Sequence, residues 1–153
     1  MLGIEIDSEE YTNFSGMYYD VLKNFKAESK EEKQTIRQIT VDVYRTFNTF
    51  KLKFLNNKVE TGQNKLYNLL KVYALILDPT VGYTQGMNFI AAIILMHVPN
   101  EALACQIFTK LLQKDNWARM YICSTPKLFD LINLISSKVE KELPALWAHL
   151  FEY

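Results

Sequence analysis

Apolar side chains recur every three or four residues along most of this chain, which is the spacing of helices that bury one face. Such stripes lie within residues 36–47, 66–77, 103–112 and 128–139. The chain contains no convincing pair of segments in which apolar and polar residues alternate, as they do in β-strands. The pattern therefore predicts an all-α domain of seven or eight helices, without internal repeats or low-complexity linkers.

Capping signals predict where the first helices begin. The residues Asp7–Glu10 can cap a short first helix, and Ser15–Gly16 separates it from a second helix over Met17–Lys26. Ser29 and Glu32 then match a capping box, in which each side chain accepts a hydrogen bond from an exposed backbone N–H group. This box predicts the start of a third helix.

The third helix carries two charged residues, Asp42 and Arg45, three positions apart and therefore close together on its surface. Beyond it, Phe50, Leu52 and Phe54 alternate with lysines, which by period alone is typical of a strand. A lone strand has nothing to pair with. We therefore interpret this segment as an extended loop or an irregular helix.

A loop that contains Pro79 and Gly82 interrupts the apolar pattern in the middle of the chain. Pro79 disfavours helix at the preceding residue, and Gly82 can take the backbone angles of a sharp turn, so the helix that begins near Thr61–Asn64 should end here. Gln85 then opens a helix whose residues are apolar on every side up to Met96. That composition predicts a buried helix with no solvent-exposed face.

In the second half of the chain, proline and capping residues predict three helix boundaries. Pro99–Asn100 ends one helix and begins an amphipathic helix that runs to Lys114, and a short aromatic connection follows over Trp117–Ile122. Thr125–Pro126 predicts a helix that begins with a capping hydroxyl and a proline, and Pro144 separates it from the last helix. The predicted inner face of the helix after Pro126 consists of Leu128, Leu131, Ile132, Ile135 and Val139.

Length, composition and charge exclude several classes of protein. The 153 residues suffice for one domain with a real core, and the 17 basic residues balance the 17 acidic ones, which disfavours a general nucleic-acid or anionic-lipid binder. Cys105 and Cys123 form no metal-binding spacing, and His97 and His149 are expected to be structural. No signal peptide or membrane-spanning run is evident, so we expect a cytoplasmic protein without membrane insertion.

Two short motifs together resemble the TBC domain, the family of Rab GTPase-activating proteins. The first is Ile39-x-x-Asp42-x-x-Arg45 followed by Thr-Phe, and the second is Val-Gly-Tyr83-Thr-Gln85-Gly-Met-Asn-Phe. Both occur in this order on either side of an apolar helix. The close resemblance covers roughly residues 36–112, and looser helical similarity continues to the end.

The resemblance implies a GTPase activator that supplies catalytic groups to its partner. Arg45 would enter the nucleotide pocket of a Rab-family GTPase and neutralise charge on the transferring phosphoryl group, while Gln85 would orient the attacking water. GTP and magnesium would belong to the partner, so no cofactor, metal site or stand-alone reaction is expected. The protein would reach endomembranes in vesicle trafficking through this partner.

Four further residues receive supporting roles from the same resemblance. Asp42 could hold Arg45 or its loop, Ile39 should pack the helix against the core, and Tyr83 could fix the direction of the Gln85 amide. Gly86 leaves room for a close partner.

The chain departs from the family pattern in three places. Asn48 replaces a usual proline and could loosen the loop that carries Arg45, and the first tryptophan is Trp117 instead of an early Arg and Trp pair. We also expect a single domain over residues 1–153 that is truncated before its C-terminal lobe.

The residues alone leave simpler alternatives open. Arg45 could be a surface arginine paired with Asp42, Gln85 an ordinary helix-start residue, and Tyr83 a core residue. The competing function is a Rab-binding or scaffold module without catalysis. A stand-alone hydrolase is a third possibility, but neither a nucleotide-binding Gly-rich loop nor a Ser-His-Asp arrangement is evident.

Overall fold

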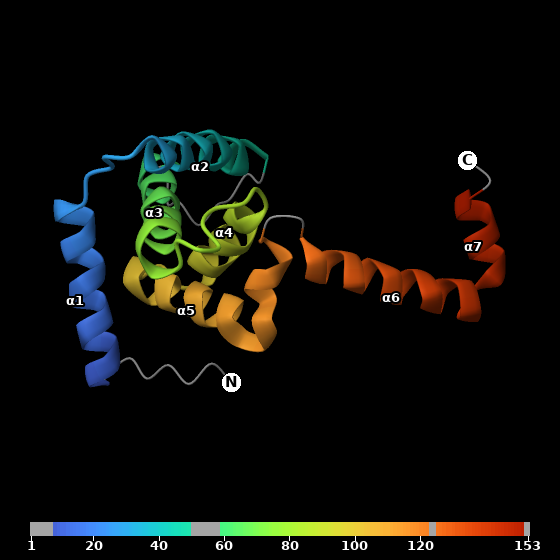
Figure 1. Ribbon diagram of the computed structural model, residues 1–153. Coiled ribbons are helices and arrows are strands. Elements are labelled where there is room, and N and C mark those ends of the chain that lie inside the picture. The colour runs from blue at the N-terminus through green and yellow to red at the C-terminus, as the bar shows by residue number, and fades with distance from the viewer. Residues whose placement is uncertain (1–7, 50–58, 123–124, 152–153) are drawn as a thin grey trace.

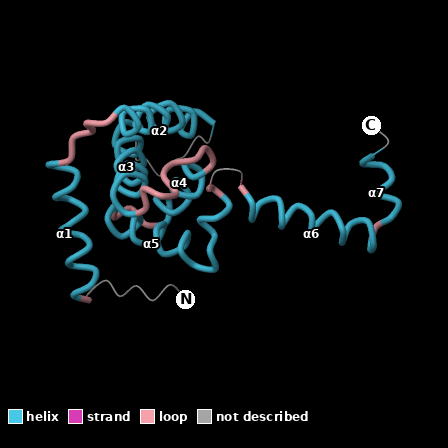
Figure 2. Tube along the Cα trace, in the orientation of Figure 1, coloured by secondary structure: helices cyan, strands magenta, loops and turns pink. Residues whose placement is uncertain are grey.

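The computed structural model describes residues 8–49, 59–122 and 125–151, and within these ranges every regular element is a helix (Figure 2). The all-α prediction is therefore confirmed. The alternating segment at residues 50–54 lies outside the described residues. In chain order the elements are α1 (Glu9–Asn24), α2 (Lys30–Thr49), α3 (Val59–Val72), η2 (Tyr73–Leu77), α4 (Met87–His97), α5 (Glu101–Gln113), η3 (Lys114–Met120), α6 (Pro126–Glu142) and α7 (Pro144–Phe151).

The core is built around α3, which packs against α1, α2, α4 and α5 (Figure 1). Leu66, Leu69, Leu70 and Val72 have no exposed side-chain area, and Tyr73 at the start of η2 is equally buried. Each such aliphatic side chain contributes about 1.5–3 kcal/mol by leaving water. The stripe that predicted this helix is thus its central contact surface, although the helix begins at Val59, slightly before the predicted start.

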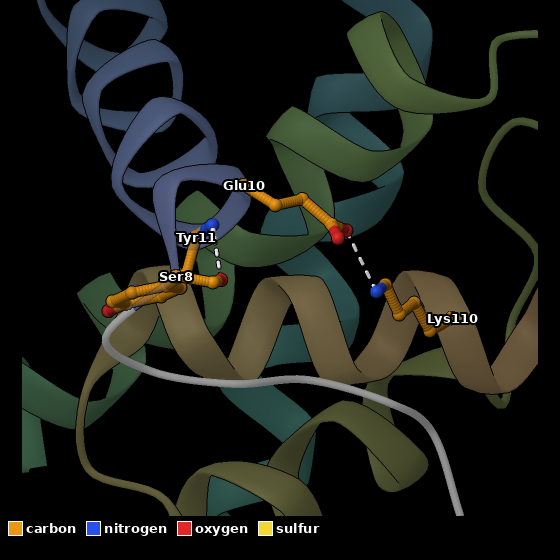
Figure 3. Close-up of polar contacts among 4 residues, drawn as sticks. All are labelled: Ser8, Glu10, Tyr11 and Lys110. Atoms are coloured by element: carbon orange, nitrogen blue, oxygen red, sulfur yellow. Dashed lines mark hydrogen bonds and ion pairs between the residues drawn. The ribbon is translucent and has the colours of Figure 1, made fainter.

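The first helix is continuous, and the prediction of two helices divided at Ser15–Gly16 was wrong. A single glycine inside a helix costs only about 0.5–1 kcal/mol relative to alanine. The buried Tyr11 and Tyr18 lie on either side of the glycine and fix both halves to the body. Ser8 caps this helix by accepting a hydrogen bond from Tyr11 N at 3.2 Å (Figure 3).

Polar contacts connect α1 to the start and the end of α5. Glu10 forms an ion pair with Lys110 at 2.8 Å (Figure 3). At the other end of α5, the Tyr18 hydroxyl donates a hydrogen bond to Glu101 Oε1 at 2.9 Å, and Asn68 Nδ2 on α3 donates to the same oxygen at 3.1 Å. Glu101 therefore joins three helices, and burial raises the pKa of Tyr18 far above its usual value.

The capping box predicted at the start of α2 is confirmed. Glu32 N donates to Ser29 Oγ at 3.0 Å, and Ser29 N donates to Glu32 Oε2 at 3.0 Å. Glu28 N also donates to Glu32 Oε2 at 2.8 Å, and the hydrogen bonds from the Glu28 and Ser29 N–H groups lower the pKa of Glu32.

The helix continues to Thr49, so Asp42 and Arg45 both lie on it, as their spacing predicted. The expectation that a loop carries Arg45 was wrong. Asn48 has helical backbone, which a proline would interrupt by removing a backbone donor.

The fourth helix is buried on one side only, so the prediction of a helix without a solvent-exposed face was wrong. Met87, Ala91 and Leu95 are almost completely buried against the core, whereas Phe89 is 37% and Ile93 54% exposed. Apolar composition all around a helix does not specify which of its faces the neighbouring helices cover.

The last two helices begin where proline predicted, at Pro126 and Pro144. The expected cap is absent, because Thr125 has a left-handed backbone (φ 40°) and its side chain makes no capping hydrogen bond. The expected inner face is also wrong, since among the described elements α6 packs substantially only against η3 and α7 and projects from the body (Figure 1). Its apolar residues are largely exposed, namely Leu128, Leu131, Ile132 and Ile135. No helix in the described ranges is long and apolar enough to cross a membrane.

Candidate functional site

The loop that carries Gln85 begins with a tight turn at the end of η2. Asp78 N donates a hydrogen bond to Tyr73 O at 2.9 Å, and Gly82 N donates to Asp78 O at 2.9 Å. Asp78 Oδ1 also accepts from the Thr80 hydroxyl at 2.7 Å. Gly82 has φ 65°, a left-handed conformation that glycine adopts without strain. The turn predicted from Pro79 and Gly82 is therefore confirmed.

Gln85 lies at the end of this loop, immediately before α4, and its side chain is exposed. The next residue, Gly86, is the N-cap of the helix and has φ 107°. Residues with a Cβ atom rarely adopt this backbone angle. A Cβ atom there would approach nothing closer than Tyr121 Cε1 at 4.0 Å. Glycine is therefore required by backbone geometry, and the local space does not require it.

Arg45 is exposed on α2 and faces the same open groove as Gln85. The groove has a volume of about 430 Å³ and its remaining lining comes mainly from α2. The two residues singled out from separate motifs, forty positions apart in sequence, thus share one surface depression. The lining residues are Gln34, Arg37, Gln38, Val41, Asp42, Arg45 and Gln85.

A buried hydrogen bond connects the two motifs beneath this groove. The Tyr83 hydroxyl donates to Asp42 Oδ2 at 2.9 Å, and both residues are less than a tenth exposed. Burial, together with the hydrogen bond and charge of Asp42, raises the pKa of Tyr83 well above its ordinary value, so the phenol stays a donor. Asp42 and Tyr83 therefore hold the Gln85 loop against the helix that carries Arg45.

A second polar connection runs parallel to the first. The Thr46 hydroxyl donates to Asp42 O at 2.7 Å and accepts a hydrogen bond from Asn88 Nδ2, while Asn88 Oδ1 accepts from Gly86 N at 2.9 Å. Asn88 is 2% exposed and Thr46 is fully buried. Sequence reasoning missed both residues. The available signal was a lone asparagine inside an otherwise apolar helix and a threonine one turn after Asp42.

Ile39 lies on the opposite side of α2 from the groove. It is fully buried in the core together with Val43, one turn later. Large apolar side chains at this spacing fix the rotation of the helix about its own axis. Because that rotation is fixed, Arg45 is presented to solvent on the groove side.

Other reactive residues stand apart from this site. Cys105 is completely buried, as expected for a small core residue, and burial raises its pKa. His97 is exposed at the end of α4, with Nδ1 2.8 Å from Ile93 O. In the described parts of the chain no three His, Cys, Asp or Glu residues are grouped in a way that could hold a metal ion.

Comparisons with known proteins identify the relatives of this chain. The sequence model of the Rab-GTPase-TBC domain matches residues 1–153. The human protein named ecotropic viral integration site 5 protein homolog is 32% identical over 108 residues, which are 71% of this chain and 13% of that protein. GTPase-activating protein GYP5 of Saccharomyces cerevisiae is 33% identical over 60% of this chain and 10% of its own length.

A third relative, human TBC1 domain family member 1, is 40% identical over 76 residues, which are 45% of this chain and 6% of that protein. The chain therefore spans about a tenth of the length of these curated relatives. No solved structure matches the chain significantly.

Proposed function

Because the chain belongs to the Rab-GTPase-TBC domain family, we propose that it accelerates GTP hydrolysis by a Rab-family GTPase. Arg45 and Gln85 supply the catalytic groups in trans. The observation that carries this proposal is their position on one open groove, on backbones joined by two buried polar connections.

The chemistry of the two side chains fits this role. The arginine guanidinium is planar and always charged, so it can neutralise negative charge that develops on the transferring phosphoryl group. The glutamine amide has both donors and an acceptor, so it can hold a water molecule and a phosphate oxygen together. An arginine finger contributes about 10³ to 10⁵ in rate in comparable systems.

The buried residues beneath the groove support the proposal through positioning. Correct placement of reacting groups contributes several kcal/mol to catalysis, and small displacements are costly. The Asp42–Tyr83 hydrogen bond fixes the loop at one side of Gln85, and the Asn88–Gly86 hydrogen bond fixes it at the other. Asp42, Tyr83, Ile39 and Gly86 thus act as positioning residues, and none of them needs to contact the nucleotide.

The partner GTPase supplies the remaining parts of the reaction. It holds GTP and magnesium, so this chain requires no cofactor and carries out no hydrolysis alone. The protein works in the cytoplasm and meets membranes only where its partner is anchored, in vesicle trafficking.

Single-turnover GTP hydrolysis by a panel of Rab-family GTPases tests the proposal. We expect the chain to stimulate at least one GTPase, and Arg45→Ala to reduce that stimulation about 10³-fold or more. Arg119→Ala, which removes an exposed arginine on η3, is the matched control and should leave the rate unchanged. The thermal unfolding midpoint of each variant is measured in parallel, because a lower midpoint for Arg45→Ala would indicate a structural role instead.

Gln85→Ala tests the second catalytic group independently. We expect a loss of stimulation comparable with that of Arg45→Ala, without loss of binding to GTPase loaded with a non-hydrolysable GTP analogue. An unchanged rate would contradict the role of Gln85. Binding without any stimulation by the parent chain would support the scaffold alternative.

A further inference from the structure

The groove that contains Arg45 and Gln85 continues along α2 towards its N-terminus. A second open groove, of about 490 Å³, shares Gln34 and Arg37 with the first and extends to Lys30 and Lys33. The two grooves therefore form one surface along the helix. We refer to Lys30, Lys33, Arg37 and Arg45 as the cationic strip.

Helical spacing places the cationic strip on one exposed face of α2. Its members are separated by three, four and eight residues, which are spacings of side chains on the same side of a helix. All four are exposed. The chain as a whole carries no net charge, so four cations on one face are a local concentration that overall composition does not explain.

The carboxylates that line the same surface compensate only part of this charge. They are two, Glu28 and Asp42, against four cations. The Asp42 carboxylate lies beneath the surface and accepts the Tyr83 hydrogen bond. Glu31 and Glu32 add two more carboxylates in the first turn of α2, and Glu32 keeps its charge in the capping box. Neither of them lines the two grooves, so the excess of positive charge is confined to the groove lining.

Arg37 is exposed on the surface that the two grooves share. Its guanidinium makes no hydrogen bond or ion pair with any residue that the structure describes, and its side chain is exposed. Lys33, by contrast, donates to Glu28 O at 2.8 Å. Five donors of an arginine are thus available on a surface that is continuous with the proposed catalytic groove.

We propose that Arg37, assisted by Lys30 and Lys33, binds acidic side chains of the GTPase that border its nucleotide pocket. This inference rests on the proposed function. Eight residues of α-helix separate Arg37 from Arg45, a rise of about 12 Å. If Arg45 contacts the γ-phosphate of the bound GTP, Arg37 would therefore contact the GTPase surface about 12 Å away from that phosphate.

Continuity with the Gln85 groove favours a protein partner over a lipid surface. Gln38 and Val41 line the groove between the two arginines, and Gln34 lines it beside Arg37. These side chains offer hydrogen bonds and apolar contact to an irregular protein surface. The cations also lie along a groove, whereas a membrane surface would contact a flat or protruding cluster. Charged contacts at the rim of an interface act mainly on the association rate and on its salt dependence.

The test measures binding and catalysis separately. Association of the chain with GTPase loaded with a non-hydrolysable GTP analogue is measured at several ionic strengths, and single-turnover hydrolysis is measured at saturating chain. Arg37→Gln should slow association roughly three- to tenfold at low salt and flatten its salt dependence, while the maximal rate stays within about twofold. Arg37→Lys should restore most of the association rate, and Arg37→Glu should slow it further.

Lys114→Gln is the matched control, because Lys114 is exposed on η3 and lines neither of the two grooves. It should change neither association nor rate.

Each other outcome has a definite meaning. An Arg37→Gln variant that associates like the parent overturns this inference, even if Arg45→Ala shows that the proposed function is correct. A lower maximal rate with unchanged association would make Arg37 catalytic and would also overturn it. The strip would instead be a lipid-binding surface if the parent chain binds phosphatidylserine vesicles and Arg37→Gln abolishes that binding while GTPase association stays unchanged. A parent chain that neither binds nor stimulates any GTPase overturns both proposals.

Discussion

At the scale of single residues, the candidate site depends on polar groups that are buried and fully engaged. Asp42 offers its side chain to Tyr83 and its backbone carbonyl to Thr46, so one residue anchors both connections to the Gln85 loop. A buried polar group costs little when it is hydrogen-bonded and about 1–3 kcal/mol when it is not. These contacts should therefore influence stability and catalysis together.

Tyr83→Phe is the direct test of this coupling. The substitution keeps the ring and removes the donor to the buried Asp42 carboxylate, so the free energy of unfolding should fall by about 1–3 kcal/mol. Stimulation of GTP hydrolysis should also fall, because the loop before Gln85 loses a fixed contact. Urea unfolding and single-turnover hydrolysis measure the two effects.

Tyr67→Phe is the matched control for that variant. Tyr67 is half-buried, and its hydroxyl makes no hydrogen bond within the described residues, so the change should stay within about 0.5 kcal/mol. Equal effects of the two substitutions would show that the Asp42–Tyr83 hydrogen bond does not stabilise the site.

At the scale of elements, local signals predicted helix boundaries better than they predicted contacts. The capping box at Ser29 and the proline at Pro126 each mark the start of a helix, because such boundaries depend on neighbouring residues alone. Gly16 was misread as a boundary, since packing of Tyr11 and Tyr18 outweighs its weak local preference. The exposed faces of α4 and α6 depend on distant helices, which periodicity does not specify.

Two glycines test this distinction between local preference and required geometry. Gly16→Ala should raise the free energy of unfolding by about 0.5–1 kcal/mol, because Gly16 is inside α1 with no atom within 4 Å of the added Cβ. Gly86→Ala should lower it by about 1–3 kcal/mol, because φ 107° is strained for alanine although the space is open. Chemical denaturation of both variants checks the opposite signs. Equal signs would show that helix content alone determines the effect.

At the scale of the whole molecule, the family expected from two motifs is confirmed, and with it the all-α fold. The motifs identified both partners of the buried Asp42–Tyr83 hydrogen bond. They did not identify Thr46 and Asn88, because a polar residue inside a helix reveals its partner only once the helices are packed. The sequence did not reveal the cationic strip, since its continuity with the Gln85 groove is a tertiary property.

The buried tyrosines make the stability of the entire domain sensitive to alkaline pH. Burial raises the pKa of Tyr18, Tyr73 and Tyr83 in the folded state, whereas an unfolded tyrosine has a pKa of about 10. Above that pH the unfolded chain loses these protons while the folded chain keeps them, so stability is fully present below about pH 10 and declines as pH rises beyond it.

Denaturation midpoints measured between pH 8 and pH 11 should therefore be constant at first and then fall. Tyr73→Phe should flatten the alkaline decline by removing one of the titrating groups, whatever it does to stability at pH 8. Tyr44→Phe, which alters an exposed ring, should leave the shape of the profile unchanged. The three tyrosines lie on α1, η2 and the loop before α4, so a single alkaline transition would show that these parts unfold as one cooperative unit. If Tyr73→Phe leaves the pH profile of the denaturation midpoint unchanged, burial of the Tyr73 phenol is not a cause of the alkaline loss of stability.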